Sequence, residues 1–148
     1  FGDQLNLVIN PEKKTNPFAP ELLNIKTKNI GDLKFQSTPF FKAKTLYQID
    51  PTYAVVFNLK DKNRYEQYYP NINIYYWINW IAIRFVVGSN IVNVEPLYGV
   101  WQVDFADFKE YLRTCPVHSY QQRVDDTKGN AKSSFVCDIR NEIFTRIV

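Results

Sequence analysis

Residues 20–36 read PELLNIKTKNIGDLKFQ, and this stretch decides the fold. Residues 21–25 and residues 30–35 each have the length and the apolar content of a short β-strand. The polar residues 26–29 between them suit a tight turn. The stretch therefore predicts a β-hairpin.

The hairpin brings two carboxylates together. A turn centred near residues 26–27 pairs Glu21 with residues 32–34. Glu21 and Asp32 are then cross-strand neighbours, directly opposite or diagonal, roughly 5–8 Å apart. Two carboxylates at this spacing can hold a divalent metal ion beside a phosphodiester.

Side-chain alternation gives the second strand two different faces. Asp32, Lys34 and Gln36 share one face because successive side chains of a strand point to opposite sides. Leu33 and Phe35 point the other way, and we expect that side to be the core. The polar triplet would then lie on a strand whose opposite face is anchored.

The composition favours a sheet-rich protein. Of the 148 residues, 16% are aromatic and only 5 are glycine, and aromatic residues are enriched in strands. Residues 71–80 alternate as a strand with one apolar face, and Gly88-Ser89-Asn90 marks a hairpin within residues 84–94. Residues 106–114 predict a helix. We expect an α+β (α/β) fold with a strand-rich mixed central sheet and few flanking helices, in one domain over 1–148. Further expected elements are a helical turn within residues 60–69 and a loop over residues 117–133.

Several functional classes lack support. Two cysteines and one histidine do not make a zinc site. A Ser-His-Asp hydrolase also has little support, because the chain has one histidine and no serine-containing nucleophile motif. The cysteines could form one disulfide, but reduced thiols in a cytoplasmic protein are the expectation. No signal peptide and no apolar run of membrane-spanning length occurs, so we expect no membrane partner. Since the chain starts at Phe1 without Met, we expect a segment before it.

An acid two residues before a lysine is a weak signal by itself. The four examples here are Glu12/Lys14, Asp32/Lys34, Asp107/Lys109 and Asp126/Lys128. Only Asp32/Lys34 lies in an expected strand and follows a Pro-acid pair across a turn. A structural hairpin with exposed charges is the alternative interpretation.

This arrangement resembles the PD-(D/E)XK nuclease superfamily. The matching residues are Pro20-Glu21 and Asp32-Leu33-Lys34, which cover about twenty residues of the chain together with the turn between them. Glu21 stands where the family usually has aspartate, and the family's acidic N-terminal helix is not evident. The resemblance implies a restriction-endonuclease-like core and a metal-dependent endonuclease or exonuclease, a hydrolase of phosphodiester bonds.

The resemblance also implies roles for the residues. Glu21, Asp32 and the Leu33 carbonyl would bind Mg²⁺ or Mn²⁺, which prefers oxygen ligands. Lys34 would orient the attacking water and stabilise charge on the phosphate. Gln36 could position the water or a phosphate oxygen, although an ordinary polar strand residue is the simpler interpretation.

Basic residues near the hairpin suggest a nucleic-acid partner. The net charge is only +3, but residues 26–44 hold five lysines and one acid. A second basic and aromatic segment lies within residues 118–132. The expected contacts are Lys26, Lys28, Lys42, Lys44, Tyr120, Arg123, Lys128 and Lys132. We expect the nucleic-acid partner to be DNA rather than RNA. Whether the protein forms a homodimer is left open. The alternative function is a non-catalytic module that binds nucleic acid or protein through this basic aromatic surface.

Overall fold

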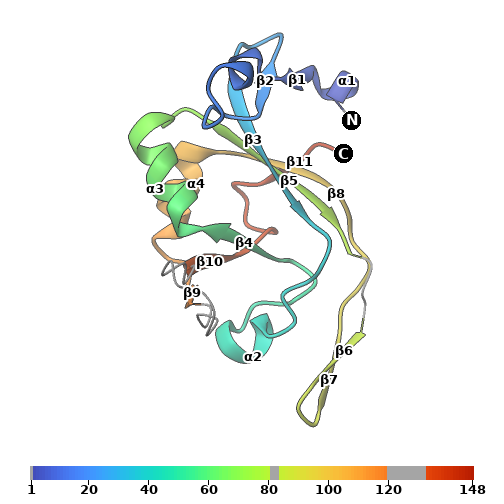
Figure 1. The fold of residues 1–148 in the computed structure, drawn as a ribbon. Helices are drawn as coiled ribbons and strands as arrows, with labels where there is room; N and C mark the ends of the chain where they lie inside the picture. The colour runs from blue at the N-terminus through green and yellow to red at the C-terminus, as the bar shows by residue number, and fades with distance from the viewer. Residues whose placement is uncertain (1, 81–83, 120–132) are drawn as a thin grey trace.

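The computed structural model describes residues 2–80, 84–119 and 133–148. Its main feature is a six-stranded sheet (Figure 1). In spatial order its strands are β1 (Leu7–Ile9), β2 (Leu22–Asn24), β3 (Ile30–Gln36), β5 (Asn73–Asn79), β8 (Tyr98–Asp104) and β11 (Thr145–Arg146). Strands β3 and β5 are parallel, and all other neighbours in this sheet are antiparallel. The expected α+β class with a strand-rich mixed sheet is confirmed.

A second, smaller sheet packs against the first. It holds, in spatial order, β4 (Ala54–Asn58), β10 (Ser133–Asp138) and β9 (Val117–Ser119). Strand β9 occupies the start of the expected loop, because it pairs with the first half of β10. Strands β6 (Arg84–Val87) and β7 (Asn90–Asn93) form the expected hairpin, which projects from the rest of the molecule (Figure 1).

The helices are short, and two of them lie at one end of the sheets. The helical segments are α1 (Gly2–Leu5), the 3-10 turn η1 (Pro11–Lys14), α2 (Ala43–Tyr47), α3 (Leu59–Tyr68) and α4 (Phe105–Leu112). Helices α3 and α4 lie beside each other (Figure 1). Helix α3 is longer than the single turn expected from the sequence. Its first turn is capped by the Asn58 side chain, which accepts a hydrogen bond of 2.8 Å from the Lys60 backbone N–H.

The polar face of β3 points into the molecule. Asp32 is in register with Ile74 and Lys34 with Tyr76 on the parallel neighbour β5, and both β5 residues are fully buried. Residues in register on adjacent strands share a face. Phe35, on the opposite face, is 52% exposed. The prediction that Leu33 and Phe35 face the main core is therefore wrong, since alternation defines two faces without saying which one is covered.

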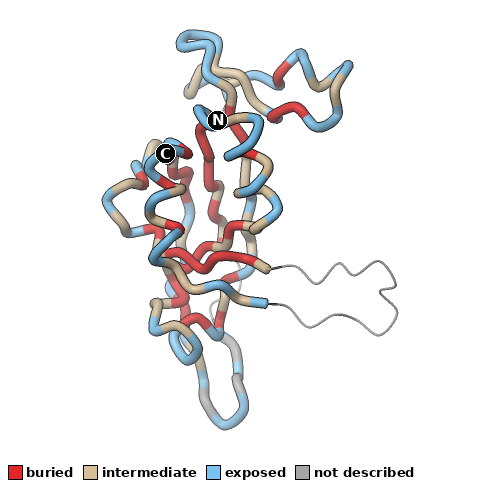
Figure 2. The backbone as a smooth tube through the Cα atoms, turned by 90° about the vertical axis from the view of Figure 1, so that its left-hand side faces the viewer, coloured by how far each residue is buried: buried red, intermediate tan, exposed pale blue. Residues whose placement is uncertain are grey.

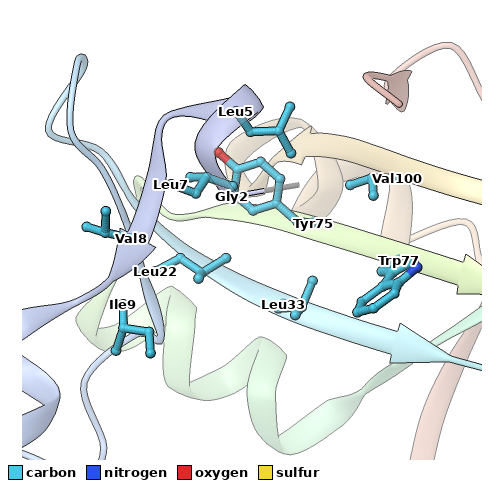
Figure 3. A pocket seen from close by; sticks show the side chains of 10 residues that line it. All are labelled: Gly2, Leu5, Leu7, Val8, Ile9, Leu22, Leu33, Tyr75, Trp77 and Val100. Atoms are coloured by element: carbon cyan, nitrogen blue, oxygen red, sulfur yellow. The ribbon is translucent and has the colours of Figure 1, made fainter.

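The outer face of the sheet is covered only in part, by the N-terminal segment. A pocket of about 330 Å³ lies there, between Leu5 and Leu7 on one side and Leu33, Tyr75 and Trp77 on the other (Figure 3). On the outer side of β3, Leu33 faces this pocket and its apolar lining. Most of the buried residues lie instead on the strands in the middle of the molecule (Figure 2).

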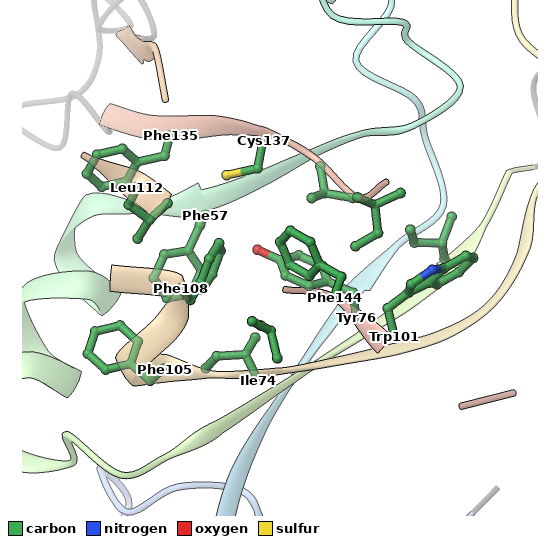
Figure 4. Packing of buried hydrophobic residues seen from close by; sticks show 14 of the residues in the cluster. Phe57, Ile74, Tyr76, Trp101, Phe105, Phe108, Leu112, Phe135, Cys137 and Phe144 are labelled. Atoms are coloured by element: carbon green, nitrogen blue, oxygen red, sulfur yellow. The ribbon is translucent and has the colours of Figure 1, made fainter. Parts of the chain in front are cut away.

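An aromatic cluster fills the space between the sheets and the helices. Phe108 of α4 is fully buried, and its ring centroid lies 4.8 Å from Phe57, 5.4 Å from Phe144 and 6.2 Å from Tyr76 (Figure 4). Tilted and edge-to-face pairs at these distances are favourable beyond the apolar area they bury. The cluster joins β4, β5, α4 and the segment before β11 into one core.

The two cysteines lie opposite each other in an extension of the β9–β10 ladder. Val117 is in register with Phe135, and the Val136 backbone N–H donates to the Pro116 carbonyl at 2.9 Å. Continued by two residues, this register pairs Cys115 with Cys137 at a non-hydrogen-bonded site, where α-carbons are about 4.5 Å apart. That spacing is within the range a disulfide needs. Both thiols are free in this structure.

We therefore expect a mild thiol oxidant such as diamide to join Cys115 to Cys137 within one chain. The product would lose two hydrogens, detected as a mass decrease of about 2 Da, and its melting temperature would rise by about 5–10 °C because the crosslink restricts the unfolded chain. Cys115→Ser should show neither change. Oxidised dimers without the intrachain bond would contradict the proposed pairing.

Candidate functional site

Five side chains on β3 and α3 form a closed ring of polar contacts, which we call the Asp32 ring. The Lys34 Nζ lies 2.8 Å from Asp32 Oδ2 and 2.5 Å from Asp61 Oδ2. Arg64 Nη2 lies 3.3 Å from Asp61 Oδ1 and donates to the Tyr65 hydroxyl at 3.1 Å. The Tyr65 hydroxyl closes the ring by donating to Asp32 Oδ2. Two carboxylates and two cations leave the ring without net charge.

Helix α3 supplies three members of this ring, and none of the three was expected beside the hairpin acids. Asp61, Arg64 and Tyr65 have the spacing i, i+3, i+4, so they lie on one face of the helix. Tyr65 is only 1% exposed, which shows that this aromatic residue belongs to the core. The sequence signal for this helix face is the i, i+3, i+4 spacing of the three residues, which follows the capping residue Asn58.

Burial and charge fix the protonation of the ring. Burial lowers the pKa of Lys34, but Asp32 and Asp61 outweigh it, and the pKa of Lys34 is raised above its usual value. Burial and the adjacent Asp32 raise the pKa of Tyr65. Lys34 is therefore a cation and Tyr65 a neutral hydroxyl at physiological pH, and both act as donors.

Glu21 lies one residue before β2. In β2 and β3 Leu22 is opposite Gly31 and Leu23 is opposite Ile30, and the same register continued by one residue would set Glu21 opposite Asp32. Glu21 is exposed. Within residues 2–80, 84–119 and 133–148, its carboxylate makes no hydrogen bond or ion pair, so it is available to a ligand.

The Leu33 carbonyl points to the side of β3 that β2 leaves open. The Asn24 N–H donates to the Asn29 carbonyl at 2.8 Å, so hydrogen-bonded pairs recur at every second position of this ladder. The next such pair towards the strand end would be Pro20 with Leu33. Proline has no N–H, so Pro20 cannot donate to the Leu33 carbonyl.

This part of the hairpin carries oxygen atoms of the kind that a hard divalent cation prefers. The set consists of the Glu21 carboxylate, the Leu33 carbonyl and Asp32 Oδ1, an atom without a hydrogen-bond partner among the described residues. Mg²⁺ takes few protein oxygens and keeps several waters. In the described part of the chain, no three acidic, histidine or cysteine side chains come together as a metal site. The donor set here depends on a main-chain carbonyl as its third member.

Gln36 has a partner other than the expected water. Its Oε1 accepts a hydrogen bond of 3.0 Å from the Val56 N–H of β4. The Tyr76 hydroxyl donates to the Val56 carbonyl, also at 3.0 Å. In this structure Gln36 links β3 to β4 across the two sheets.

The predicted basic contacts are dispersed. Lys26 and Lys28 lie in the β2–β3 turn, whereas Lys42 and Lys44 lie at α2, near the opposite end of the molecule (Figure 1). All four side chains are exposed. The remaining predicted contacts fall outside the described residues: Tyr120, Arg123, Lys128 and Lys132.

A cleft opens beside the Asp32 ring. Strand β2 pairs only with Ile30 and Gly31, so the edge of β3 is open from Leu33 onwards on that side. A hollow of about 370 Å³ lies between this part of β3 and the β4–α3 junction, and Lys34 and Asp61 line it. Asp32 lies deeper, with 7% of its side chain exposed against 23% for Lys34.

Comparison of the chain with family models, curated proteins and solved structures found no match. The resemblance to the PD-(D/E)XK nucleases rests on the hairpin residues alone. None of the helices in the described ranges has both the length and the apolar character needed to cross a bilayer.

Proposed function

We propose that this protein is a divalent-metal-dependent nuclease that hydrolyses phosphodiester bonds, with DNA as the first substrate to test. The observation that carries the proposal is the hairpin register, which pairs Leu22 with Gly31 and, continued by one residue, would set Glu21 opposite Asp32, with Lys34 on the same face of β3 as Asp32. The open Leu33 carbonyl gives further support. The adjoining cleft offers space for a strand of nucleic acid.

Each residue of the proposed site has a role that follows from its chemistry. Glu21, Asp32 and the Leu33 carbonyl would hold Mg²⁺ or Mn²⁺, which when bound lowers the pKa of a coordinated water and neutralises phosphate charge. Lys34, protonated and at the wall of the cleft, donates to a phosphate oxygen as negative charge develops there. A bond forms between the water oxygen and phosphorus while the bond to the leaving oxygen breaks. The water proton passes to solvent, and the leaving oxygen takes up a proton.

The test is cleavage of labelled duplex and single-stranded DNA and RNA in Mg²⁺ or Mn²⁺, with EDTA as the metal-free control. We expect Asp32→Asn, which keeps the shape of the side chain, and Lys34→Ala each to lower the cleavage rate by roughly 100-fold or more. Asp107→Asn and Lys109→Ala are matched controls, since they carry the same acid-x-Lys spacing on α4 and should keep the wild-type rate.

Each variant should first be shown to be folded by circular dichroism. Equal cleavage by wild type, Asp32→Asn and Lys34→Ala would reject the proposed site. Retention of a nucleic acid in a gel without metal-dependent cleavage would support the non-catalytic binding module instead.

A further inference from the structure

We infer that Asp61 is a positioning residue that holds Lys34 at the wall of the cleft, an inference that rests on the proposed nuclease function. In this structure the Lys34 ammonium is shared between two carboxylates. Its contact with Asp61, at 2.5 Å, is shorter than its contact with Asp32, at 2.8 Å. Asp61 belongs neither to the hairpin nor to the resemblance found in the sequence.

Asp61 and Asp32 have different roles because they lie in different places relative to the cleft. Asp61 and Lys34 both line the cleft, whereas Asp32 does not. Under the proposed function Asp32 is committed to the metal ion, whose positive charge weakens its attraction for the Lys34 ammonium. Asp61 is then the anion that keeps Lys34 close to the substrate.

Asp61 is itself held firmly enough for this task. It lies in the first turn of α3, directly after the capped start of the helix. Arg64 engages its Oδ1 at 3.3 Å, which leaves Oδ2 directed at Lys34. A side chain that is fixed on a rigid element by supporting contacts can hold a reacting group in the geometry that the reaction needs. A displacement of that reacting group by about 1 Å can lower the rate roughly 100-fold.

The experiment compares wild type with Asp61→Asn, which keeps the shape but not the charge, and uses Asp107→Asn as the control. Cleavage is measured in Mg²⁺ over a range of substrate concentrations, so that kcat and KM are obtained separately for each variant.

The kinetics distinguish positioning from general stabilisation. We expect Asp61→Asn to lower kcat by roughly 10–100-fold with KM changed less than about threefold. Asp61→Glu, which restores the charge with one more methylene, should recover part of kcat. A wild-type kcat in Asp61→Asn would overturn the inference, as would a rise in KM that accounts for the whole loss of kcat/KM.

The two proposals fail in different ways. If the wild-type protein cuts nothing in Mg²⁺ or Mn²⁺, the nuclease proposal fails and the Asp61 contact is structural only, which also overturns the positioning role. If cleavage depends on Lys34 but not on Asp61, the nuclease proposal stands and the positioning role fails.

Discussion

Replacing Phe108 with alanine is expected to lower the free energy of unfolding by about 3–5 kcal/mol, the usual cost of truncating a buried aromatic residue. Phe108 is fully buried and touches rings from β4, β5 and the segment before β11. The loss would leave a cavity at the point where the two sheets and α4 meet. Urea denaturation measures the change directly.

Phe35→Ala is the matched control for this prediction. Phe35 is 52% exposed and its main contact is the Trp77 ring, 4.8 Å away. Its replacement should cost only about 0.5–1.5 kcal/mol, the range for one aromatic pair. Equal losses for the two variants would contradict the conclusion that the core lies on the Asp32 side of β3.

Replacing Asp32 with alanine is expected to lower the free energy of unfolding by about 2–4 kcal/mol. The substitution removes one of the two anions of Lys34 and the acceptor of the buried Tyr65 hydroxyl, and it leaves the Asp32 ring with a net positive charge. Lys34 keeps its contact with Asp61, which limits the loss. Chemical denaturation monitored by tryptophan fluorescence would measure the difference.

The control is Asp107→Ala, which removes an exposed carboxylate on α4 and should change stability by less than about 0.5 kcal/mol. A similarly small effect of Asp32→Ala would mean that the ring contributes little to folding. The role of Asp32 would then be something other than stabilising the fold.

The hairpin and β5 show what local patterns can predict. The two strands of the hairpin pair where the turn length predicts, Leu22 with Gly31 and Leu23 with Ile30, because turn length and strand alternation are local properties. The apolar face of β5 is confirmed, with Ile74, Tyr76 and Ile78 all fully buried. The alternation of apolar residues along β5 predicts its buried face without reference to the rest of the fold.

The inner face of β3 could not be predicted in the same way. A strand with polar side chains on one face and apolar ones on the other normally turns the apolar face inward. Here Asp32 and Lys34 face inward because α3 brings them compensating partners from 27 or more residues away along the chain. Such partners have no local signature on β3. The Asp61, Arg64 and Tyr65 spacing was visible on α3, but nothing in the sequence showed which strand it meets.

The link between Gln36, Tyr76 and Val56 has a consequence for self-association. Strand β4 is an outer strand of its sheet, and such strands expose N–H and C=O groups that can recruit a strand from another molecule. At Val56 both groups are already occupied by side chains of the larger sheet. A foreign strand would have to displace two hydrogen bonds before it could pair at Val56, so the middle of this edge is blocked without a charged residue or a proline in β4.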